Sequence, residues 1–160
     1  MTTSVSVTTP SDREIRVERT FDAPAPLVFD FHTKPELVKR WLLGPPGWSM
    51  PVCEIDLTVG GRYRYTWRSD ADGREFGVQG QFTEIASPER IVNVETMDGR
   101  PGEVVVTTTF EDAGAKTKFA ISMRFDSREA RDAALETGMT EGMAMSYDRL
   151  QSIVVGGSSA

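Results

Sequence analysis

The sequence contains a single cysteine, Cys53, and a single histidine, His32. One cysteine excludes an internal disulfide bond, and one of each residue is too few for a zinc site of conventional composition. The sequence also lacks a nucleophile elbow, a phosphate-binding loop and a histidine pair with metal-ligand spacing. We therefore expect neither a metal nor another cofactor.

Long hydrophobic runs are missing as well. No apolar segment approaches the roughly 18 residues that are needed to span a bilayer. Residues 1–10 lack the basic start and the apolar middle of a signal peptide. A lone cysteine is typical of a reducing compartment. These absences predict a cytoplasmic protein that does not insert into membranes.

An excess of basic charge is absent too. The 160 residues include 18 Lys and Arg against 24 Asp and Glu, which gives a net charge of -6 and an isoelectric point near 4.9. This balance opposes binding to nucleic acid. The length fits one domain. We expect a disordered tail over residues 1–11, a single domain over residues 12–155 and a flexible tail over residues 156–160.

Hydrophobic periodicity predicts an α+β fold. Residues 13–21 alternate as in a half-buried strand, and two short helices follow, broken before Pro35. The period then changes to two, and turn signals such as Gly60-Gly61 and Asp72-Gly73 separate the segments. These strands are expected at residues 52–59, 62–68, 75–85, 91–97, 104–111 and 116–125. With the first strand they form an antiparallel meander of about seven strands.

A long helix is expected over residues 128–155, with one apolar stripe that packs on the sheet. Gly138 and Gly142 lie inside this helix, where each glycine costs roughly 1 kcal/mol relative to alanine. We therefore predict that the helix bends near Gly138, or that the sheet or a ligand approaches closely at this surface. One helix fills a strongly curved sheet incompletely, which leaves room for a small molecule.

Aromatic side chains alternate with basic ones along the strand at residues 62–68. Tyr63, Tyr65 and Trp67 share one face, while the basic residues face the other way. These aromatics either fill the core or form the wall of a ligand cavity, and the sequence leaves both interpretations open.

A second group of candidates lies on the long helix and around the loop at residues 44–47. Met139, Met143 and Tyr147 recur at spacings of four, as in a packing stripe or a ligand-contacting helix face. Trp41 and Trp48 flank the loop, where they either latch it or gate a cavity. His32 is expected on a helix surface, and Cys53 is expected to be a small buried residue.

Short segments along the chain resemble one superfamily. They are FDAP at residues 21–24, WLLGP at 41–45, CEID at 53–56, GQFTEI at 80–85, TGMTEGM at 137–143 and YDRL at 147–150. Through them the chain resembles the SRPBCC (START-like, helix-grip, Bet v 1-like) superfamily. Within it the chain is similar to the AHSA1-like branch, which is related to the C-terminal domain of the activator of Hsp90 ATPase.

The resemblance implies a helix-grip fold. In this fold a curved antiparallel sheet of about seven strands surrounds a long C-terminal helix, and two short helices lie between strands one and two. The superfamily includes lipid and hormone carriers, polyketide cyclases, resistance proteins and the co-chaperone domain. Fold alone does not choose among these functions.

Our leading hypothesis is non-catalytic binding of a small hydrophobic or aromatic molecule between the sheet and the C-terminal helix. The alternatives are a cyclase- or hydrolase-type enzyme that uses the same cavity, and a chaperone-associated module, although we do not expect an Hsp90-type partner. Whether the protein forms a homodimer is left open. The expected ligand contacts are Trp41, Trp48, Tyr63, Tyr65, Trp67, Phe82, Met139, Met143 and Tyr147, and no catalytic residue is assigned.

Overall fold

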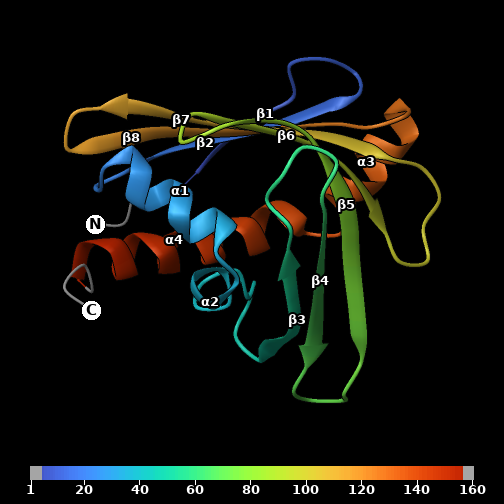
Figure 1. Ribbon diagram of the computed structural model, residues 1–160. Coiled ribbons are helices and arrows are strands. Elements are labelled where there is room, and N and C mark those ends of the chain that lie inside the picture. Colours follow the sequence, from blue (N-terminus) through green and yellow to red (C-terminus); the bar gives the residue numbers. More distant parts are fainter. Residues whose placement is uncertain (1–4, 157–160) are drawn as a thin grey trace.

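The computed structural model, which describes residues 5–156, contains one antiparallel sheet of eight strands (Figure 1). Their order in the sheet is β1-β2-β8-β7-β6-β5-β4-β3. The strands are β1 (Ser6–Thr8), β2 (Glu14–Phe21), β3 (Trp48–Ile55), β4 (Arg62–Ser69), β5 (Glu75–Ala86), β6 (Arg90–Met97), β7 (Val104–Ala113) and β8 (Lys116–Arg124). From β3 to β8 each strand pairs with the next, so the predicted antiparallel meander is confirmed for these six strands, whereas the first predicted strand, β2, pairs with β8 instead of β3.

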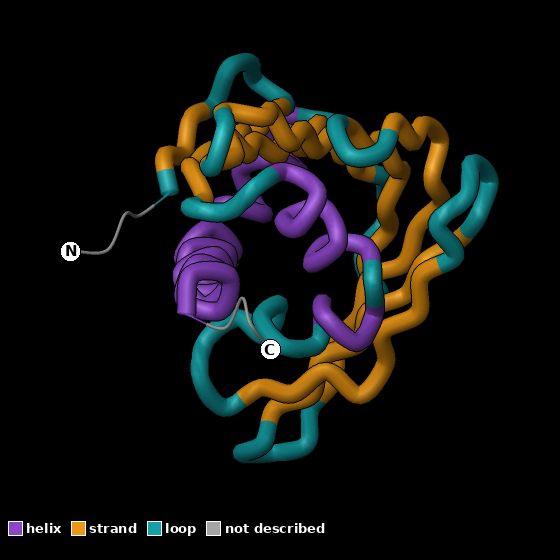
Figure 2. The backbone as a smooth tube through the Cα atoms, turned by 60° about the vertical axis from the view of Figure 1, so that its left-hand side comes forward, coloured by secondary structure: helices purple, strands orange, loops and turns teal. Residues whose placement is uncertain are grey.

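Within residues 5–156 four helices complete the fold: α1 (Ala25–Thr33), α2 (Pro35–Val38), α3 (Arg128–Glu136) and α4 (Met139–Gly156). The sheet arches around α4 and the two short helices, which lie on its inner side (Figure 2). Register shifts between Ser49 and Val52 in β3, and between Phe82 and Glu84 in β5, mark bulges. Because a bulge bends a strand and increases its twist, these positions help to curve the sheet. The predicted fold class is therefore confirmed.

The core lies where β2, β7 and β8 face α1 and α4. Phe21, Phe110 and Phe119 come from these three strands, and their rings pack edge-on or tilted with centroid separations of 5.5 to 5.7 Å. Leu150 of α4 is fully buried against the same cluster. Each fully buried aromatic or aliphatic side chain contributes about 1.5–3 kcal/mol, so this cluster fixes α4 on the sheet.

The strand count and the N-terminal boundary differ from the prediction. Residues 6–8 were expected in a disordered tail, but they form β1 and pair with residues 16–18 of β2. A three-residue edge strand is too short to give a periodic signal, and its stability comes from a partner that is distant in sequence. The predicted tail residues 1–4 and 157–160 lie outside the described residues.

The C-terminal helix is divided where a bend was predicted. Gly138 has a φ of 80°, a left-handed conformation that glycine adopts without the steric cost of a Cβ atom. This residue separates α3 from α4, so the single helix expected over residues 128–155 is wrong in detail. The break lets α4 run across the sheet in its own direction (Figure 1).

Polar contacts hold α4 and the loop after α2 together. Arg149 donates to the carbonyl oxygens of Trp41 and Gly44, at 2.9 and 3.1 Å, and the Gly44 amide donates to Ser146 Oγ at 2.8 Å. On the sheet side, the buried Arg19 guanidinium donates to Asp148 at 2.8 Å. These bonds attach α4 to the loop after α2 on one side and to β2 on the other.

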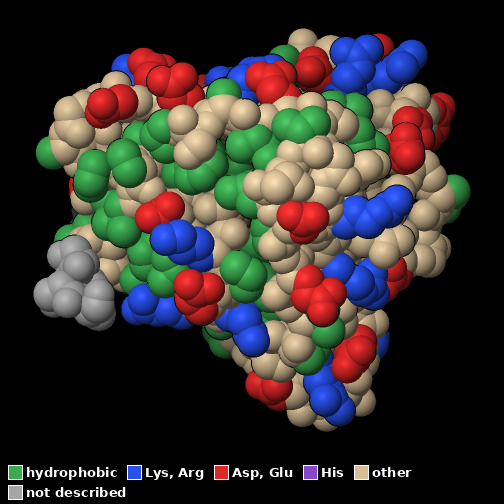
Figure 3. Space-filling view, viewed as in Figure 1, with side chains coloured by type: hydrophobic (Ala, Val, Ile, Leu, Met, Phe, Trp, Pro, Cys, Tyr) green, Lys and Arg blue, Asp and Glu red, His purple; other side chains and the backbone are tan. Residues whose placement is uncertain are grey.

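On the face drawn in Figure 3, acidic and basic side chains are interspersed, and hydrophobic side chains gather over the helices. Within the described part of the chain, no helix is both long and apolar enough to cross a membrane.

Candidate functional site

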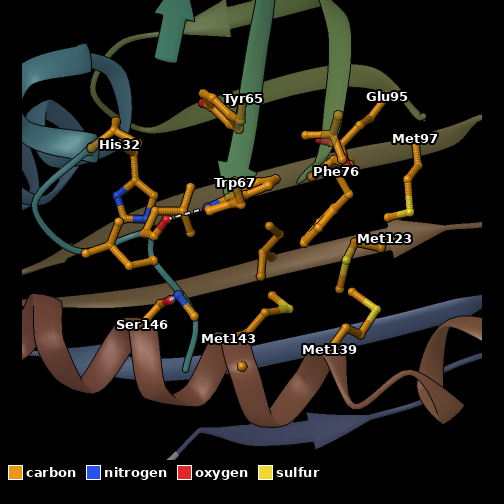
Figure 4. A pocket seen from close by; sticks show the side chains of 18 of the residues that line it. His32, Tyr65, Trp67, Phe76, Glu95, Met97, Met123, Met139, Met143 and Ser146 are labelled. Atoms are coloured by element: carbon orange, nitrogen blue, oxygen red, sulfur yellow. Dashed lines mark hydrogen bonds between the residues drawn. The ribbon is translucent and has the colours of Figure 1, made fainter. Parts of the chain in front are cut away.

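A pocket of about 810 Å³ lies between the inner face of the sheet, the first turns of α4 and the loop over residues 41–48. Side chains from β4, β5, β6, β7 and β8 line one side, and Met139 and Met143 rise from α4 on the other (Figure 4). Its volume lies within the range of about 300–1,000 Å³ that is usual for small-molecule sites. Most of the lining side chains are apolar or aromatic.

The structure brings all nine predicted contact residues to this one pocket. Tyr63, Tyr65 and Trp67 point inward from β4, as their alternation predicted. The remaining six are Trp41, Trp48, Phe82, Met139, Met143 and Tyr147. The sequence left open whether the aromatic face fills the core or forms a cavity wall. Tyr63 does both, because it belongs to the buried core and also lines the pocket.

Two indole groups close the end of the pocket near the loop after α2. Trp41 Nε1 donates to the Phe31 carbonyl at 2.8 Å, and Trp67 Nε1 donates to the Leu42 carbonyl at 2.7 Å. Both indole donors are therefore engaged by the backbone, and the rings present their apolar surfaces to the pocket. Trp41 is fully buried, which favours the latch interpretation for this residue.

The structure contradicts the prediction that His32 lies on a helix surface. Its ring packs between Phe119, Phe110 and Trp41, with centroid separations of 5.0, 5.1 and 4.8 Å. The Nδ1 atom lies 2.8 Å from the Val28 carbonyl, and Nε2 is enclosed without a hydrogen-bond partner among residues 5–156. Burial lowers the pKa of His32 to about 4, so the ring is neutral at pH 7.

The sequence does contain a signal for this placement. His32 follows Val28 by four residues, and Val28 lies on the buried face of α1. Residues four apart share a helix face, so the spacing places His32 toward the core.

Sequence reasoning also missed a polar cluster in the pocket. Tyr63 Oη donates to Glu95 Oε1, and Asn93 Nδ2 donates to Tyr63 Oη, both at 2.7 Å. Burial raises the pKa of Glu95 above its usual range, and the bond from Tyr63 acts in the opposite direction. Glu95 is therefore a carboxyl group within a largely apolar lining.

The other candidate groups are poorly suited to catalysis near neutral pH. Burial raises the pKa of the half-buried Cys53 thiol to about 11, so little of the reactive thiolate forms. Burial likewise raises the pKa values of Tyr65 and Tyr147, whose hydroxyls stay protonated. Within residues 5–156, no group of three metal-ligating side chains lies together.

A comparison with known protein families assigns the chain to one of them. The model of the family described as "Activator of Hsp90 ATPase homolog 1-like protein" matches residues 22–155. The chain belongs to this family. The resemblance drawn from the sequence segments is thereby confirmed, and the family's fold is that of a ligand-binding or chaperone-associated domain.

Solved structures agree with this family assignment. A crystal structure from Rhodobacter sphaeroides is 26% identical, with a TM-score of 0.90 over 96% of this chain and 99% of that one. A solution structure from Arthrobacter aurescens is also 26% identical, with a TM-score of 0.83 over 96% and 92% of the two chains. An AHSA1-like protein from Aeromonas hydrophila, at 21% identity, shares the fold with a TM-score of 0.71 over 89% and 94%. No curated protein matches the chain.

Proposed function

We propose that this family member binds a small hydrophobic or aromatic molecule in the pocket and releases it unchanged. The supporting observation is the pocket itself, about 810 Å³ of space with a mainly apolar lining that includes nine aromatic side chains and four methionines. Aromatic walls supply large apolar contact areas, and methionine adapts its shape to irregular contents. These properties suit binding by burial of apolar surface.

A screen of fatty acids, flavonoids, polyketides and sterols tests this proposal. We expect at least one class to raise the melting temperature and to shift the NMR signals of Tyr63, Tyr65, Met139 and Tyr147, which line the pocket. The methyl signals of Val7 and Val105, which are exposed, serve as the reference for non-specific effects. A screen in which no compound shifts the pocket signals contradicts the proposal.

Gly142 offers a way to fill the pocket by mutation. A Cβ atom at Gly142 would lie 3.7 Å from Pro45 Cδ, an ordinary contact, so the backbone tolerates a side chain there. In Gly142→Leu the outer side-chain atoms occupy pocket space, and leucine is the better helix former. We expect the affinity for an identified ligand to fall about tenfold, which corresponds to about 1.4 kcal/mol, without a lower melting temperature.

The matched control is Glu141→Leu, at an exposed neighbour on α4 that does not line the pocket. We expect this variant to bind like the parent protein in isothermal titration calorimetry. If Gly142→Leu also binds like the parent, the first turns of α4 do not contact the ligand.

One observation favours a second candidate function, a cyclase- or hydrolase-type enzyme. Glu95 is a half-buried carboxyl group in the pocket whose pKa is raised by desolvation, and such groups can act as general acids near neutral pH. Recovery of an identified ligand after long incubation distinguishes the two functions. Unchanged ligand supports binding alone, and a product whose formation stops in Glu95→Gln supports the enzyme.

A further inference from the structure

The cluster of Tyr63, Asn93 and Glu95 at one end of the pocket owes its geometry to a glycine. Across the sheet, Tyr63 pairs with Gly80, and Gly80 pairs with Glu95. A Cβ atom on Gly80 would lie 2.5 Å from Tyr63 Oη and 2.6 Å from Tyr63 Cε1, closer than atoms can pack. The absence of a side chain at Gly80 therefore lets the phenol cross β5 and reach the carboxyl group of Glu95.

The hydrogen bonds of this cluster run in one direction. The Asn93 amide donates to Tyr63 Oη, and Tyr63 donates its only proton to Glu95 Oε1. Tyr63 and Asn93 thus hold Glu95 as an acceptor, and successive bonds in a chain strengthen one another. The second carboxyl oxygen takes no hydrogen bond from any of residues 5–156.

The charges around the pocket leave Glu95 without a counterion. Asp98 is paired with Arg64 at 2.7 Å, and the Arg74 guanidinium lies 5.6 Å from the centre of the Trp48 ring. Within residues 5–156, no Lys or Arg forms an ion pair with Glu95, while Arg74, Asp98 and Arg100 line the same pocket. A buried carboxylate is costly unless a cation or hydrogen-bond donors offset its lost hydration.

The surroundings of Glu95 also suit a cation that carries an aromatic body. Figure 4 places Glu95 beside Phe76 and Met97. Tyr65 and Trp67 project from β4, and His32 lies on the opposite side of the pocket. Aromatic faces attract cations and also bury apolar rings. The acceptor and the apolar wall therefore lie within one pocket, at separate positions.

Building on the proposed function, we infer that the pocket prefers arylalkylamines. The protonated amino group donates to the free oxygen of Glu95, and the aromatic body lies against the wall formed by Tyr65, Trp67 and Phe76. Tyr63 and Asn93 are positioning residues that orient the carboxyl group.

Three probes with the same aromatic body and different head groups test this inference: naphthylethylamine, naphthylethanol and naphthylacetate. In calorimetric titrations at pH 7 we expect the parent protein to bind the amine about tenfold more tightly than the alcohol, and the acid most weakly. Glu95→Gln keeps the side-chain shape and the acceptor for Tyr63 but removes the charge. We expect it to lose the preference for the amine and to bind the alcohol within about twofold of the parent.

The matched control is Glu111→Gln, which removes an exposed carboxylate on β7, and we expect it to retain the preference for the amine. Equal binding of the three probes by the parent overturns this inference and leaves the proposed function standing. Retention of the preference in Glu95→Gln overturns it as well. If none of the probes binds, this inference is overturned, and the proposed function is decided by the ligand screen described above. The comparison of head groups in the parent needs no variant, so it remains decisive if Glu95→Gln folds poorly.

Discussion

Acidification from pH 7 to pH 4 is expected to remove about 3 kcal/mol from the free energy of unfolding through His32 alone. In the unfolded chain the imidazole binds a proton near its ordinary pKa of 6.5, whereas in the folded protein burial holds the pKa at about 4. Between these values the unfolded state binds more protons, so stability falls as the pH falls. The loss grows as the pH falls from 6.5 to 4 and levels off below pH 4.

The cause is the position of the ring among Phe119, Phe110 and Trp41. A proton on Nε2 would place a donor and a positive charge where no acceptor among residues 5–156 can receive them. Glu95 has the opposite effect on stability. Because its pKa is raised in the folded protein, the folded state takes up this proton at higher pH than the unfolded state, and acidification stabilises the fold. A comparison with a variant of His32 is therefore needed to isolate the histidine.

His32→Phe provides that comparison, since phenylalanine has a similar shape and suits the aromatic neighbours. We expect its stability at pH 7 to equal or exceed that of the parent, and its denaturant-derived free energy of unfolding to fall less than that of the parent between pH 6.5 and pH 4.5. His32 is the only histidine, so a single set of ring signals in NMR reports its titration. A titration midpoint near 6.5, or equal acid sensitivity in both proteins, contradicts the prediction.

The aromatic wall of the pocket could be predicted because the alternation of side chains along a strand determines which residues share a face. Tyr63, Tyr65 and Trp67 are large and apolar, while the residues between them are basic or polar, so one face of β4 is unambiguous. A bend near Gly138 was also anticipated, because glycine inside a helix needs a conformational reason, although the structure has two separate helices there. In both cases the local sequence and the tertiary structure favour the same arrangement.

The polar cluster could not be predicted, because β6 gives the opposite impression. The sequence alternation favours Val92 and Val94 as the core face of this strand, with Asn93 and Glu95 on the outer face. In the structure Asn93 is buried and Glu95 lines the pocket, whereas both valines are half-buried. The inward face is set by the pairing of β6 with β5 and β7, which depends on partners that are distant in sequence.

Gly80→Ala and Gly142→Ala are expected to change stability in opposite directions. At Gly80 a Cβ atom would clash with the Val94 carbonyl oxygen and lie 2.5 Å from Tyr63 Oη, so both the neighbouring strand and the phenol must move. Overpacking of this kind costs about 1–3 kcal/mol. At Gly142 the Cβ atom meets Pro45 Cδ at an ordinary 3.7 Å, and alanine stabilises a helix by up to about 1 kcal/mol over glycine.

Thermal unfolding measures both effects, at about 2–4 °C for each kcal/mol in a chain of this size. We expect Gly80→Ala to melt several degrees below the parent and Gly142→Ala to melt at or above it. Because the displaced phenol donates to Glu95, the NMR signals of Tyr63 and Glu95 should shift in Gly80→Ala and stay in place in Gly142→Ala. Equal melting temperatures and unchanged Tyr63 signals in Gly80→Ala would show that β5 and β6 have room for a side chain at this crossing, in which case the glycine does not position the cluster.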